Sequence, residues 1–375
     1  MKILMLLSNP YLPDARVYRE AKSLTANGHT VTVLAWDRER NRPEEEIMEG
    51  IKVIRTGPKA RGKRHFLSDI RKFWKNALRI SESLEFDVVH ANDFDTLPLA
   101  VKIKKKRKAP IVFDAHEIYS EMIRLDVPSF VASFVQLLED RHLKKVDRVI
   151  VVNEYQFYFY SKRLPKERIV IIMNAKPALK DAKKAAEMRK RLGLEGKISL
   201  IYIGALEPKR FVRELADFAG KLPDVKVIIG GYGSQREYIA KKAEKNESLI
   251  YLGLVHPDDV IPYSAAADMI VAMYKEVQTD RIATKFFDAV SAGRGLLVAD
   301  NGELTADLVR KYKGGIICEY SPESFEKAVR SLDREKIDSM GRNMAKLRER
   351  YSWDAMEKRL ISLYESISPS REVRR

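Results

Sequence analysis

The sequence predicts an α/β protein built from two parallel-sheet domains. Short apolar runs alternate with segments of helical periodicity along most of the 375 residues. The alternation starts again near residue 199, after a lysine-rich stretch, and the chain is long enough for two domains of ordinary size. Because the short runs are apolar on both faces, we expect parallel strands covered by helices on each side.

The first half of the chain alternates regularly between the two kinds of segment. Ala15–Ala26 has a helical apolar pattern that the Asn27-Gly28 turn ends. Further helices are expected at Phe66–Leu84, Leu97–Lys106 and Phe130–Lys145, and an acidic loop at Pro43–Gly50. The expected strands are Lys2–Leu7, Thr30–Ala35, Ile51–Thr56, Asp87–His90, Ile111–Asp114, Arg148–Val152 and Ile169–Met173.

The second half repeats the pattern after Lys176–Glu195, a polar helical stretch that we expect to bridge two domains. Its expected strands are Ser199–Gly204, Val225–Ile229, Leu249–Leu252, Met269–Met273, Gly295–Ala299 and Gly315–Cys318. Trp353–Ser366 is an amphipathic helix without a strand of its own. We therefore expect domains at 1–174 and 175–351, with residues 352–375 crossing back to the first domain.

The chain is strongly basic, with 69 Lys and Arg against 53 Asp and Glu, a net charge of +16. The basic residues cluster at 59–64 and 102–108. Either these clusters are ordinary solvated surface or they meet an anionic membrane surface. Nucleic acid is the least favoured partner, because few aromatic residues are interleaved with the charges.

The chain has one cysteine, Cys318, so an internal disulfide is excluded and a reducing, cytoplasmic location is expected. Met1–Leu7 is interpreted as a first strand rather than a signal peptide, because Asn9-Pro10 interrupts the apolar run. No apolar run approaches the ~20 residues of a membrane span, so any membrane contact is expected to be peripheral, at the inner face.

Two loops of the second domain have residues suited to a phosphate-bearing ligand. The strand at 199–203 leads into Gly204, followed by the adjacent cations Lys209 and Arg210, and an arginine can hold phosphate through two hydrogen bonds. Gly231 and Gly233 follow the next strand, where a backbone without side chains can approach a nucleotide. Taken singly, a solvated helix start is the better explanation of the first loop and a tight turn the commoner cause of the second.

The segment 280–293 is the most informative part of the sequence. A helix is expected to start between Asp280 and Thr284, and the free N–H groups of a helix start attract anions. Lys285 adds a full charge in the first turn, and Asp288 follows one turn later, where it can accept hydrogen bonds from a ribose diol. A sugar nucleotide carries both of these chemical groups. For a single aspartate, a helix cap or a surface charge is the alternative.

The first domain offers a histidine at the end of a predicted strand. His116 follows the strand at 111–113, where it can bind a sugar hydroxyl or share a proton with Asp114 or Glu117. Residues 114–117 also fit a capping box at a helix start, and that alternative is not decided by the sequence.

Other polar residues follow neighbouring strands of the first domain. His90 and Asp93 end the preceding strand. Asp14 and Arg16 follow the first strand, where they can reach a cleft between the two expected domains or pair with each other. No metal site is predicted, because the histidines are scattered and the Asp93-x-Asp95 pair has no further ligands nearby in sequence.

Together these residues resemble the retaining glycosyltransferases of family 4. In that family two glutamates separated by seven residues bind the donor, and Asp280-x7-Asp288 occupies the pattern, followed by the small-residue run 289–293. Tyr351-Ser352-Trp353 opens a segment similar to the family's C-terminal crossing helix. The resemblance implies the GT-B fold, in which two Rossmann-like domains face a cleft.

The resemblance also implies roles for individual residues. Asp288 is expected to bind the ribose and Asp280 to lie near the transferred sugar. Arg210 and Lys285 are expected to hold the diphosphate, and His116 to sit beside the donor sugar.

The sequence departs from the family pattern at several points. Both acids are aspartates, and Glu276, just upstream, is an alternative for the work of Asp280. Ala205 stands where the family often has arginine, and a glycine-rich loop after the first strand is absent. These departures affect the acceptor side and the phosphate contacts more than the enzyme class.

The expected function is transfer of a sugar from a nucleoside diphosphate sugar to a hydroxyl of a glycan or lipid-linked acceptor. The resemblance implies retention of configuration, and no metal or other cofactor is expected. The acceptor side is expected to include Asp14, Arg16, His90, Asp93 and Glu117. A sugar-nucleotide epimerase and a non-catalytic sugar-nucleotide-binding protein are the alternatives.

Overall fold

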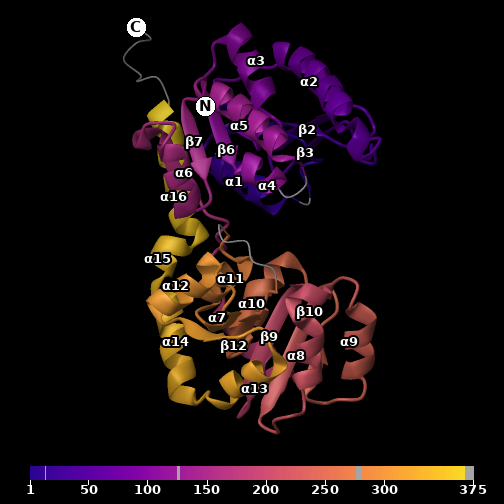
Figure 1. Ribbon diagram of the computed structural model, residues 1–375, viewed down its shortest axis with the longest axis vertical. Coiled ribbons are helices and arrows are strands. Elements are labelled where there is room, and N and C mark those ends of the chain that lie inside the picture. The colour runs from indigo at the N-terminus through magenta and orange to yellow at the C-terminus, as the bar shows by residue number, and fades with distance from the viewer. Residues whose placement is uncertain (13, 125–126, 276–280, 368–375) are drawn as a thin grey trace. The chain divides into compact units, whose positions relative to one another are not determined.

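The computed structural model describes residues 1–12, 14–124, 127–275 and 281–367, and the chain divides into two compact units (Figure 1). Unit 1 comprises Met1–Met173 and the chain from Glu357 onward, and unit 2 comprises Asn174–Met356. The domain ends predicted from the sequence are residues 174 and 351, and the unit boundaries in the structure fall after residues 173 and 356. The last helix, α16 (Trp353–Ile367), therefore begins in unit 2 and continues into unit 1.

Unit 1 is built on one eight-stranded sheet in the order β3-β4-β2-β1-β5-β6-β7-β8. All neighbouring strands are parallel except β3 and β4. The strands are β1 (Lys2–Leu7), β2 (Thr30–Trp36), β3 (Glu45–Met48), β4 (Ile51–Thr56), β5 (Val88–Asn92), β6 (Ile111–Ala115), β7 (Arg148–Val151) and β8 (Ile169–Ile171). The helices are α1 (Ala15–Ala26), α2 (Phe66–Glu82), α3 (Leu97–Arg107), α4 (Tyr119–Ile123), α5 (Ser129–Leu143) and α6 (Glu154–Ser161).

Unit 2 has a six-stranded parallel sheet in the order β11-β10-β9-β12-β13-β14. Its strands are β9 (Ile198–Ala205), β10 (Val225–Tyr232), β11 (Leu249–Tyr251), β12 (Met269–Ala272), β13 (Gly295–Ala299) and β14 (Gly315–Cys318). Its helices are α7 (Ala182–Arg191), α8 (Val212–Phe218), α9 (Arg236–Ala243), α10 (Val260–Ala266), α11 (Thr284–Ala292), α12 (Leu304–Tyr312), α13 (Pro322–Arg330), α14 (Arg334–Lys346) and α15 (Arg348–Tyr351).

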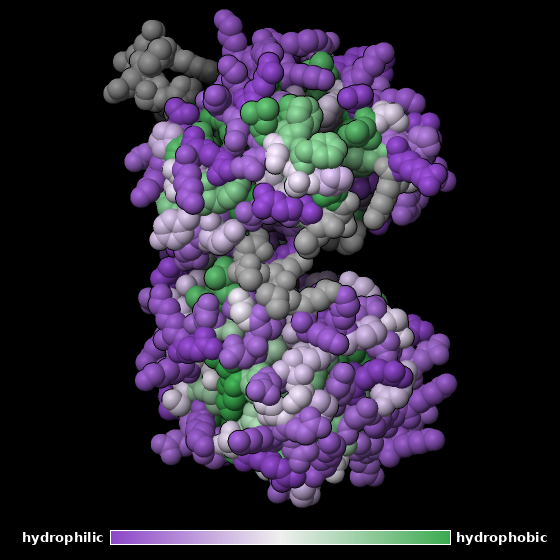
Figure 2. Space-filling view, in the orientation of Figure 1, coloured by the Kyte–Doolittle hydropathy of each residue, from purple (hydrophilic) through white to green (hydrophobic). Residues whose placement is uncertain are grey.

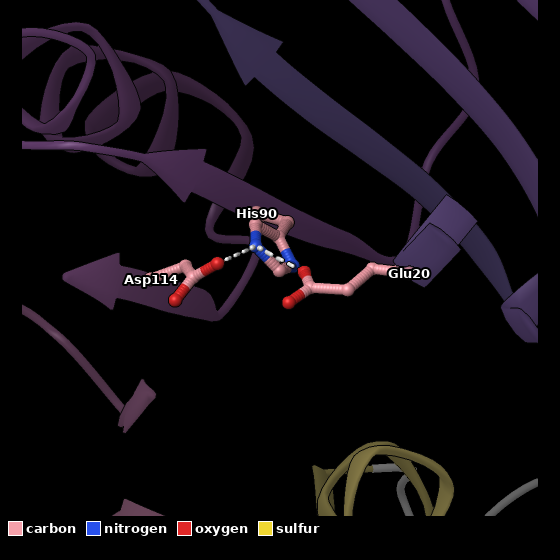
Figure 3. Close-up of side chains that lie close together, drawn as sticks. All are labelled: Glu20, His90 and Asp114. Atoms are coloured by element: carbon pink, nitrogen blue, oxygen red, sulfur yellow. Dashed lines mark ion pairs between the residues drawn. The ribbon is translucent and has the colours of Figure 1, made fainter. Parts of the chain in front are cut away.

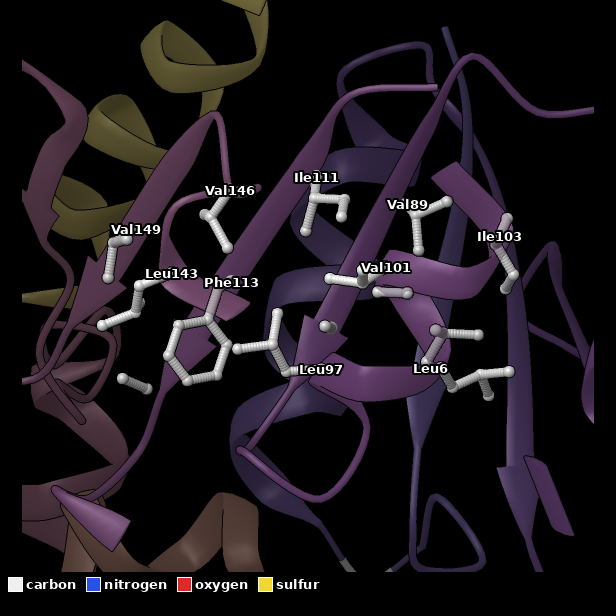
Figure 4. Close-up of a cluster of buried hydrophobic side chains, with 14 of the residues drawn as sticks. Leu6, Val89, Leu97, Val101, Ile103, Ile111, Phe113, Leu143, Val146 and Val149 are labelled. Atoms are coloured by element: carbon white, nitrogen blue, oxygen red, sulfur yellow. The ribbon is translucent and has the colours of Figure 1, made fainter. Parts of the chain in front are cut away.

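The alternation of side chains along the central strands of unit 1 sorts them onto two faces. Val89 of β5 and Ile111 and Phe113 of β6 point into a large apolar cluster that helices α2, α3 and α5 complete (Figure 4). His90 directly follows Val89 and Asp114 directly follows Phe113, so both point to the opposite face. The period of two thus delivers one histidine and one aspartate to a common side of the sheet.

Each sheet has a switch point, where the strand order reverses. In unit 1 it lies between β1 and β5, and in unit 2 between β9 and β12. In open parallel sheets ligands bind beyond the carboxyl ends of the strands at such points. The segments that follow these strands carry most of the residues singled out in the sequence.

Two expectations about local structure are wrong. The acidic stretch 43–50 is not a plain loop, because Glu45–Met48 forms β3 and pairs antiparallel with β4. The stretch 176–195 does not bridge the units, because its helix α7 belongs to unit 2, where Lys184 pairs with Asp259 at 2.6 Å. Among the described residues, no helix is long and apolar enough to cross a membrane.

Candidate functional site

The polar cluster of unit 1 is organised around a bidentate ion pair between Arg16 and Asp114. Arg16 lies in the first turn of α1, and Asp14 caps that helix by accepting from the backbone N–H groups of residues 16 and 17. The Arg16 guanidinium donates to both Asp114 oxygens, at 2.8 and 2.7 Å, and to the Ile172 carbonyl at 2.9 Å. Burial disfavours the Asp114 charge, but Arg16 and His116 outweigh it and hold the pKa of Asp114 well below its usual range.

His116 is held between two carboxylates. Its Nε2 lies 3.0 Å from Asp114 Oδ2, and its Nδ1 lies 3.2 Å from Asp93 Oδ2. Burial opposes a positive charge on the ring, but Asp93 and Asp114 together raise the pKa of His116 well above its ordinary value. The ring is therefore an imidazolium that donates from both nitrogens. In this state it is a fixed positive charge and cannot accept a proton.

Asp93 is the exposed member of this group, with 41% of its side chain accessible, against 18% for His116. It follows β5 directly and has a positive φ of 62°, an uncommon conformation for a residue other than glycine. The backbone N–H of Asp93 donates to the Asp114 carbonyl at 3.0 Å, which fixes this conformation.

Behind these residues lies a fully buried set of three ionisable groups: Glu20, His90 and Asp114 (Figure 3). His90 Nε2 is 3.7 Å from Glu20 Oε2 and 3.9 Å from Asp114 Oδ2, too far for direct hydrogen bonds. Burial raises the pKa of Glu20 to about 7. The other ring nitrogen of His90 shares a 2.6 Å hydrogen bond with the hydroxyl of Tyr364, from α16.

Glu20, His90 and Asp114 lie close enough to hold a metal ion, a grouping that the sequence did not predict. However, Arg16 Nη2 already lies 3.1 Å from Glu20 Oε1 and 2.7 Å from Asp114 Oδ1. A buried guanidinium between the two carboxylates supplies the positive charge that a cation would bring. The residues therefore fit a positioning network for His116 better than a metal centre.

The structure decides the alternatives left open for the first domain. The capping-box interpretation of residues 114–117 is wrong, because Asp114 belongs to β6 and the next helix, α4, starts only at Tyr119 without a side-chain cap. The contact between His116 and Asp114 is present, whereas Glu117 is a half-buried residue beside it. Asp14 serves as a helix cap, and the Arg16 side chain reaches Asp114.

In unit 2 the expected loop glycines Gly204 and Gly231 lie in strands β9 and β10, where they face each other in the parallel register, because both strands run further than predicted. A Cβ on Gly231 would lie 1.8 Å from the Gly204 carbonyl oxygen, and Gly231 has a φ of 134°. A Cβ on Gly233 would lie 2.6 Å from the Leu206 carbonyl oxygen. At the φ of Gly231 a side chain would point at the backbone of β9, so this paired position requires glycine.

Helix α11 places two charged residues in a buried position at its start. Lys285 in the first turn is bonded to Asp288 one turn later, and both side chains are almost fully buried. Asp288 Oδ1 is buried and has no hydrogen-bond partner among the residues that the structure describes. A buried carboxylate oxygen without a donor is costly, so this atom is suited to accept a hydrogen bond from a ligand.

The exposed Arg210 ends a short 3₁₀ helix, Pro208–Arg210, after β9. Its guanidinium lies over the ring of Tyr274, 4.4 Å from the centroid. Burial raises the pKa of Tyr274. The charge of Arg210 lowers this pKa, and the charges of Asp288 and Glu303 raise it further. These residues, which follow strands β9, β12 and β13, therefore lie near one another at one end of the sheet. Lys209 is exposed beside Arg210.

Two predicted catalytic residues, Glu276 and Asp280, lie outside the described residues. The sequence did not single out Glu20, Tyr364, Tyr274 or Glu303. Glu20 and Tyr364 resemble ordinary members of amphipathic helices, and their long-range partners give no local pattern. Glu303 precedes α12 and Tyr274 follows β12. Only the rule that ligands bind beyond the ends of parallel strands could have pointed to these two residues.

Comparison with known proteins shows the family of this chain. The sequence profile described as "Glycosyltransferase Family 4" matches residues 15–175, and that described as "Glycosyl transferases group 1" matches residues 197–334. The chain belongs to glycosyltransferase family 4. It has the two-domain GT-B fold of that family, as predicted, and is a glycosyltransferase enzyme.

Individual relatives of this glycosyltransferase are distant. It is 22% identical over 379 residues to spore coat protein SA of Bacillus subtilis, covering 93% of this chain and 94% of the relative. Sucrose-phosphate synthase from Thermosynechococcus elongatus has a similar structure, with a TM-score of 0.71, 15% identity and coverage of 98% and 99%. The Anabaena protein HepE in complex with UDP-glucose gives a TM-score of 0.67, 16% identity and coverage of 98% and 100%.

Proposed function

We propose that this glycosyltransferase binds a nucleoside diphosphate sugar at the carboxyl ends of the strands of unit 2 and transfers the sugar to an acceptor hydroxyl. The observation that carries the proposal is the buried Lys285–Asp288 pair at the start of α11. Lys285 occupies one oxygen of Asp288 and leaves Oδ1 without a donor among the described residues. A ribose hydroxyl supplies the missing donor, while Lys285 supplies a positive charge beside it.

The diphosphate is assigned to Arg210, Lys285 and the N-terminus of α11. The N-cap residue of α11, Ala283, makes no side-chain capping hydrogen bond, so it leaves the N–H groups of the first turn without a cap. Such N–H groups bind anions, and an arginine adds hydrogen bonds in fixed directions. Gly204, Gly231 and Gly233 allow the nucleotide to lie against bare backbone, and Lys209 adds charge beside Arg210. Binding of UDP-glucose by HepE, which shares the fold, supports a donor of this class.

The transfer is proposed to retain configuration and to need no metal ion. Positive groups and helix N–H groups at the diphosphate stabilise the charge that develops as the sugar leaves. The acceptor hydroxyl then gives its proton to the departing phosphate oxygen on the same face. Glu276 and Asp280 keep their proposed places near the transferred sugar.

The polar cluster of unit 1 is proposed to serve the sugar and the acceptor. His116 and Asp93 are the members with accessible side chains, so they are the ones assigned to contact with substrate. Arg16 and His90 are buried and act through Asp114, and Asp14 acts through α1. Glu117 is also assigned to the acceptor side. The acceptor is proposed to be a glycan or a lipid-linked hydroxyl, at the cytoplasmic face of a membrane.

The decisive experiment measures donor binding and turnover in two variants. Lys285→Ala and Arg210→Ala should each lower kcat/KM by about a hundredfold, the typical cost of removing one preorganised charge donor. Lys245→Ala, an exposed lysine after α9, is the matched control and should leave kcat/KM unchanged. Full turnover in the Lys285 and Arg210 variants would remove the diphosphate assignment.

Product analysis in the same assay separates the classes of reaction. Glycosyl transfer consumes the acceptor, releases the nucleoside diphosphate and persists in EDTA. A free, altered sugar nucleotide formed without acceptor would instead identify an epimerase. Tight nucleotide binding without any product would identify a binding protein.

A further inference from the structure

Unit 1 carries an exposed apolar stripe on helix α5. Phe130, Phe134 and Leu137 are 73%, 58% and 65% exposed, far above the values of core residues. Their spacing of four and three residues places them along one side of the helix. The opposite side holds Ala132, Glu139 and Leu143, which are buried against the unit. More than half of each of these side chains is therefore left out of the packing of unit 1.

Basic residues continue the same stripe. At 100° per residue, Arg141 and Lys144 fall in the same arc of about 80° as the three apolar residues. Both are exposed, and neither has an ion-pair partner in the described part of the chain. An apolar half followed by a basic half on one exposed side is the pattern of a helix that lies in a membrane interface.

Neighbouring elements extend this surface. Helix α4 packs against α5 and carries Met122, 45% exposed. Helix α6 carries Tyr155 and Tyr158, which are 40% and 64% exposed, and the Tyr155 hydroxyl ties this helix to α4 by donating to Glu121. In Figure 2, apolar side chains gather on this part of unit 1, over α5 as labelled in Figure 1.

The charge around the patch is positive. Exposed basic residues surround it: Arg124, Arg141, Lys144, Lys145 and Lys162. Of the nearby carboxylates, Asp140 is paired with Arg163 at 2.8 Å, and Glu121 accepts from Tyr155. Tyrosines and phenylalanines flanked by cations that have no ion-pair partner among the described residues complement a surface that is apolar below and anionic above.

We infer that the α5 patch, defined by Met122, Phe130, Phe134, Leu137, Tyr155 and Tyr158 with its basic rim, docks on an anionic lipid bilayer. The apolar stripe enters the headgroup region, and the rim contacts lipid phosphates. This assigns membrane contact to α5 rather than to the basic clusters at 59–64 and 102–108. The inference does not depend on the proposed donor site, because vesicle binding is measured without any sugar nucleotide.

The test is sedimentation of the full chain with vesicles of phosphatidylcholine and phosphatidylglycerol in equal amounts, and with phosphatidylcholine alone. The Phe130→Ser/Phe134→Ser variant should bind mixed vesicles at least tenfold more weakly, since each phenylalanine loses the gain of apolar burial. Arg141→Gln/Lys144→Gln should lose about fivefold per charge on mixed vesicles, and high salt should abolish the difference from the unchanged protein.

Two control variants test whether vesicle binding is specific to the α5 patch. Ile47→Ser removes an apolar residue of unit 1 that is 78% exposed but lies on β3, and it should bind like the unchanged protein. Lys105→Gln/Lys108→Gln removes exposed charges at α3 and should have the smaller effect. Equal losses from the α3 and α5 charge variants, or unchanged binding by the phenylalanine variant, would overturn the proposal. The proposal would also be overturned if the unchanged protein failed to bind vesicles but formed a dimer that the phenylalanine variant could not form. That result would assign the patch to a second copy of the chain.

Discussion

Arg16 and Asp114, 98 residues apart in the chain, form two parallel hydrogen bonds at 2.8 and 2.7 Å in the interior of unit 1. The pair joins the start of α1 to the end of β6, and Asp114 in turn holds His116. Breaking a buried ion pair on one side leaves an uncompensated charge, which is far more costly than losing an exposed pair.

Replacement of Arg16 by alanine should therefore destabilise the protein by about 3–5 kcal/mol. Lys22→Ala on the same helix is the control, because Lys22 pairs with Glu49 at 2.7 Å but both side chains are more than half exposed. That variant should cost less than about 1 kcal/mol. Urea denaturation of the two variants measures the difference, and equal losses would contradict the role given to Arg16.

The buried Glu20 should make stability depend on pH. Its pKa is raised from 4.5 to about 7 in the folded state, so the folded protein binds this proton more tightly than the unfolded chain. The resulting stability is fully present below pH 4.5 and is lost as pH rises toward 7. The raised pKa of His116 acts in the same direction only above its ordinary value of 6.5, and the lowered pKa of Asp114 acts below 3.8.

Between pH 5 and 6.5 the Glu20→Gln variant should therefore lose less stability than the unchanged protein. The difference in the free energy of unfolding should change by roughly 1–2 kcal/mol across this interval. Denaturation curves at several pH values give this difference directly. A variant with the same slope against pH as the unchanged protein would show that Glu20 titrates normally.

Most of the fold followed from sequence patterns that act locally. Short two-sided apolar runs identified the strands, and the residues after them identified the loops that carry Arg210, Lys285 and His116. The edge strand β3 was missed because Glu45 and Glu46 make it polar, and its pairing with β4 is a tertiary effect. Glu20 and Tyr364 were missed for a related reason, because each meets His90 only after the chain has folded.

The pairing of Gly231 with Gly204 across strands β10 and β9 gives a third prediction. Gly231→Ala should cost at least about 3 kcal/mol, because its Cβ would lie 1.8 Å from the Gly204 carbonyl oxygen, and backbone cannot yield as a flexible side chain does. Gly253→Ala is the control, with a φ of 68° and nothing within 4 Å of the new Cβ. It should cost about 1 kcal/mol, the strain of a left-handed conformation alone. Thermal unfolding compares the two, and similar melting temperatures would show that β9 and β10 can move apart.

The two carboxylates on His116 predict a pH profile for catalysis. If the imidazolium is the active form, kcat/KM should stay constant at neutral pH and fall as pH rises through the raised pKa of His116. Asp93→Asn removes one of the two carboxylates that raise this pKa, so the fall should move to lower pH. His116→Gln should remove this alkaline limb altogether while lowering kcat/KM at every pH.

Glu85→Gln is the matched control for the Asp93 variant, because Glu85 lies before β5, at the opposite end from Asp93, and is 80% exposed. It also removes one negative charge from unit 1, yet its profile should coincide with that of the unchanged enzyme. Initial rates at low donor concentration between pH 6 and pH 10 give kcat/KM for the four proteins. An Asp93→Asn profile that is unchanged, or that shifts to higher pH, would contradict the assignment of the charged ring to catalysis, since loss of a neighbouring carboxylate can only weaken a proton's hold on His116.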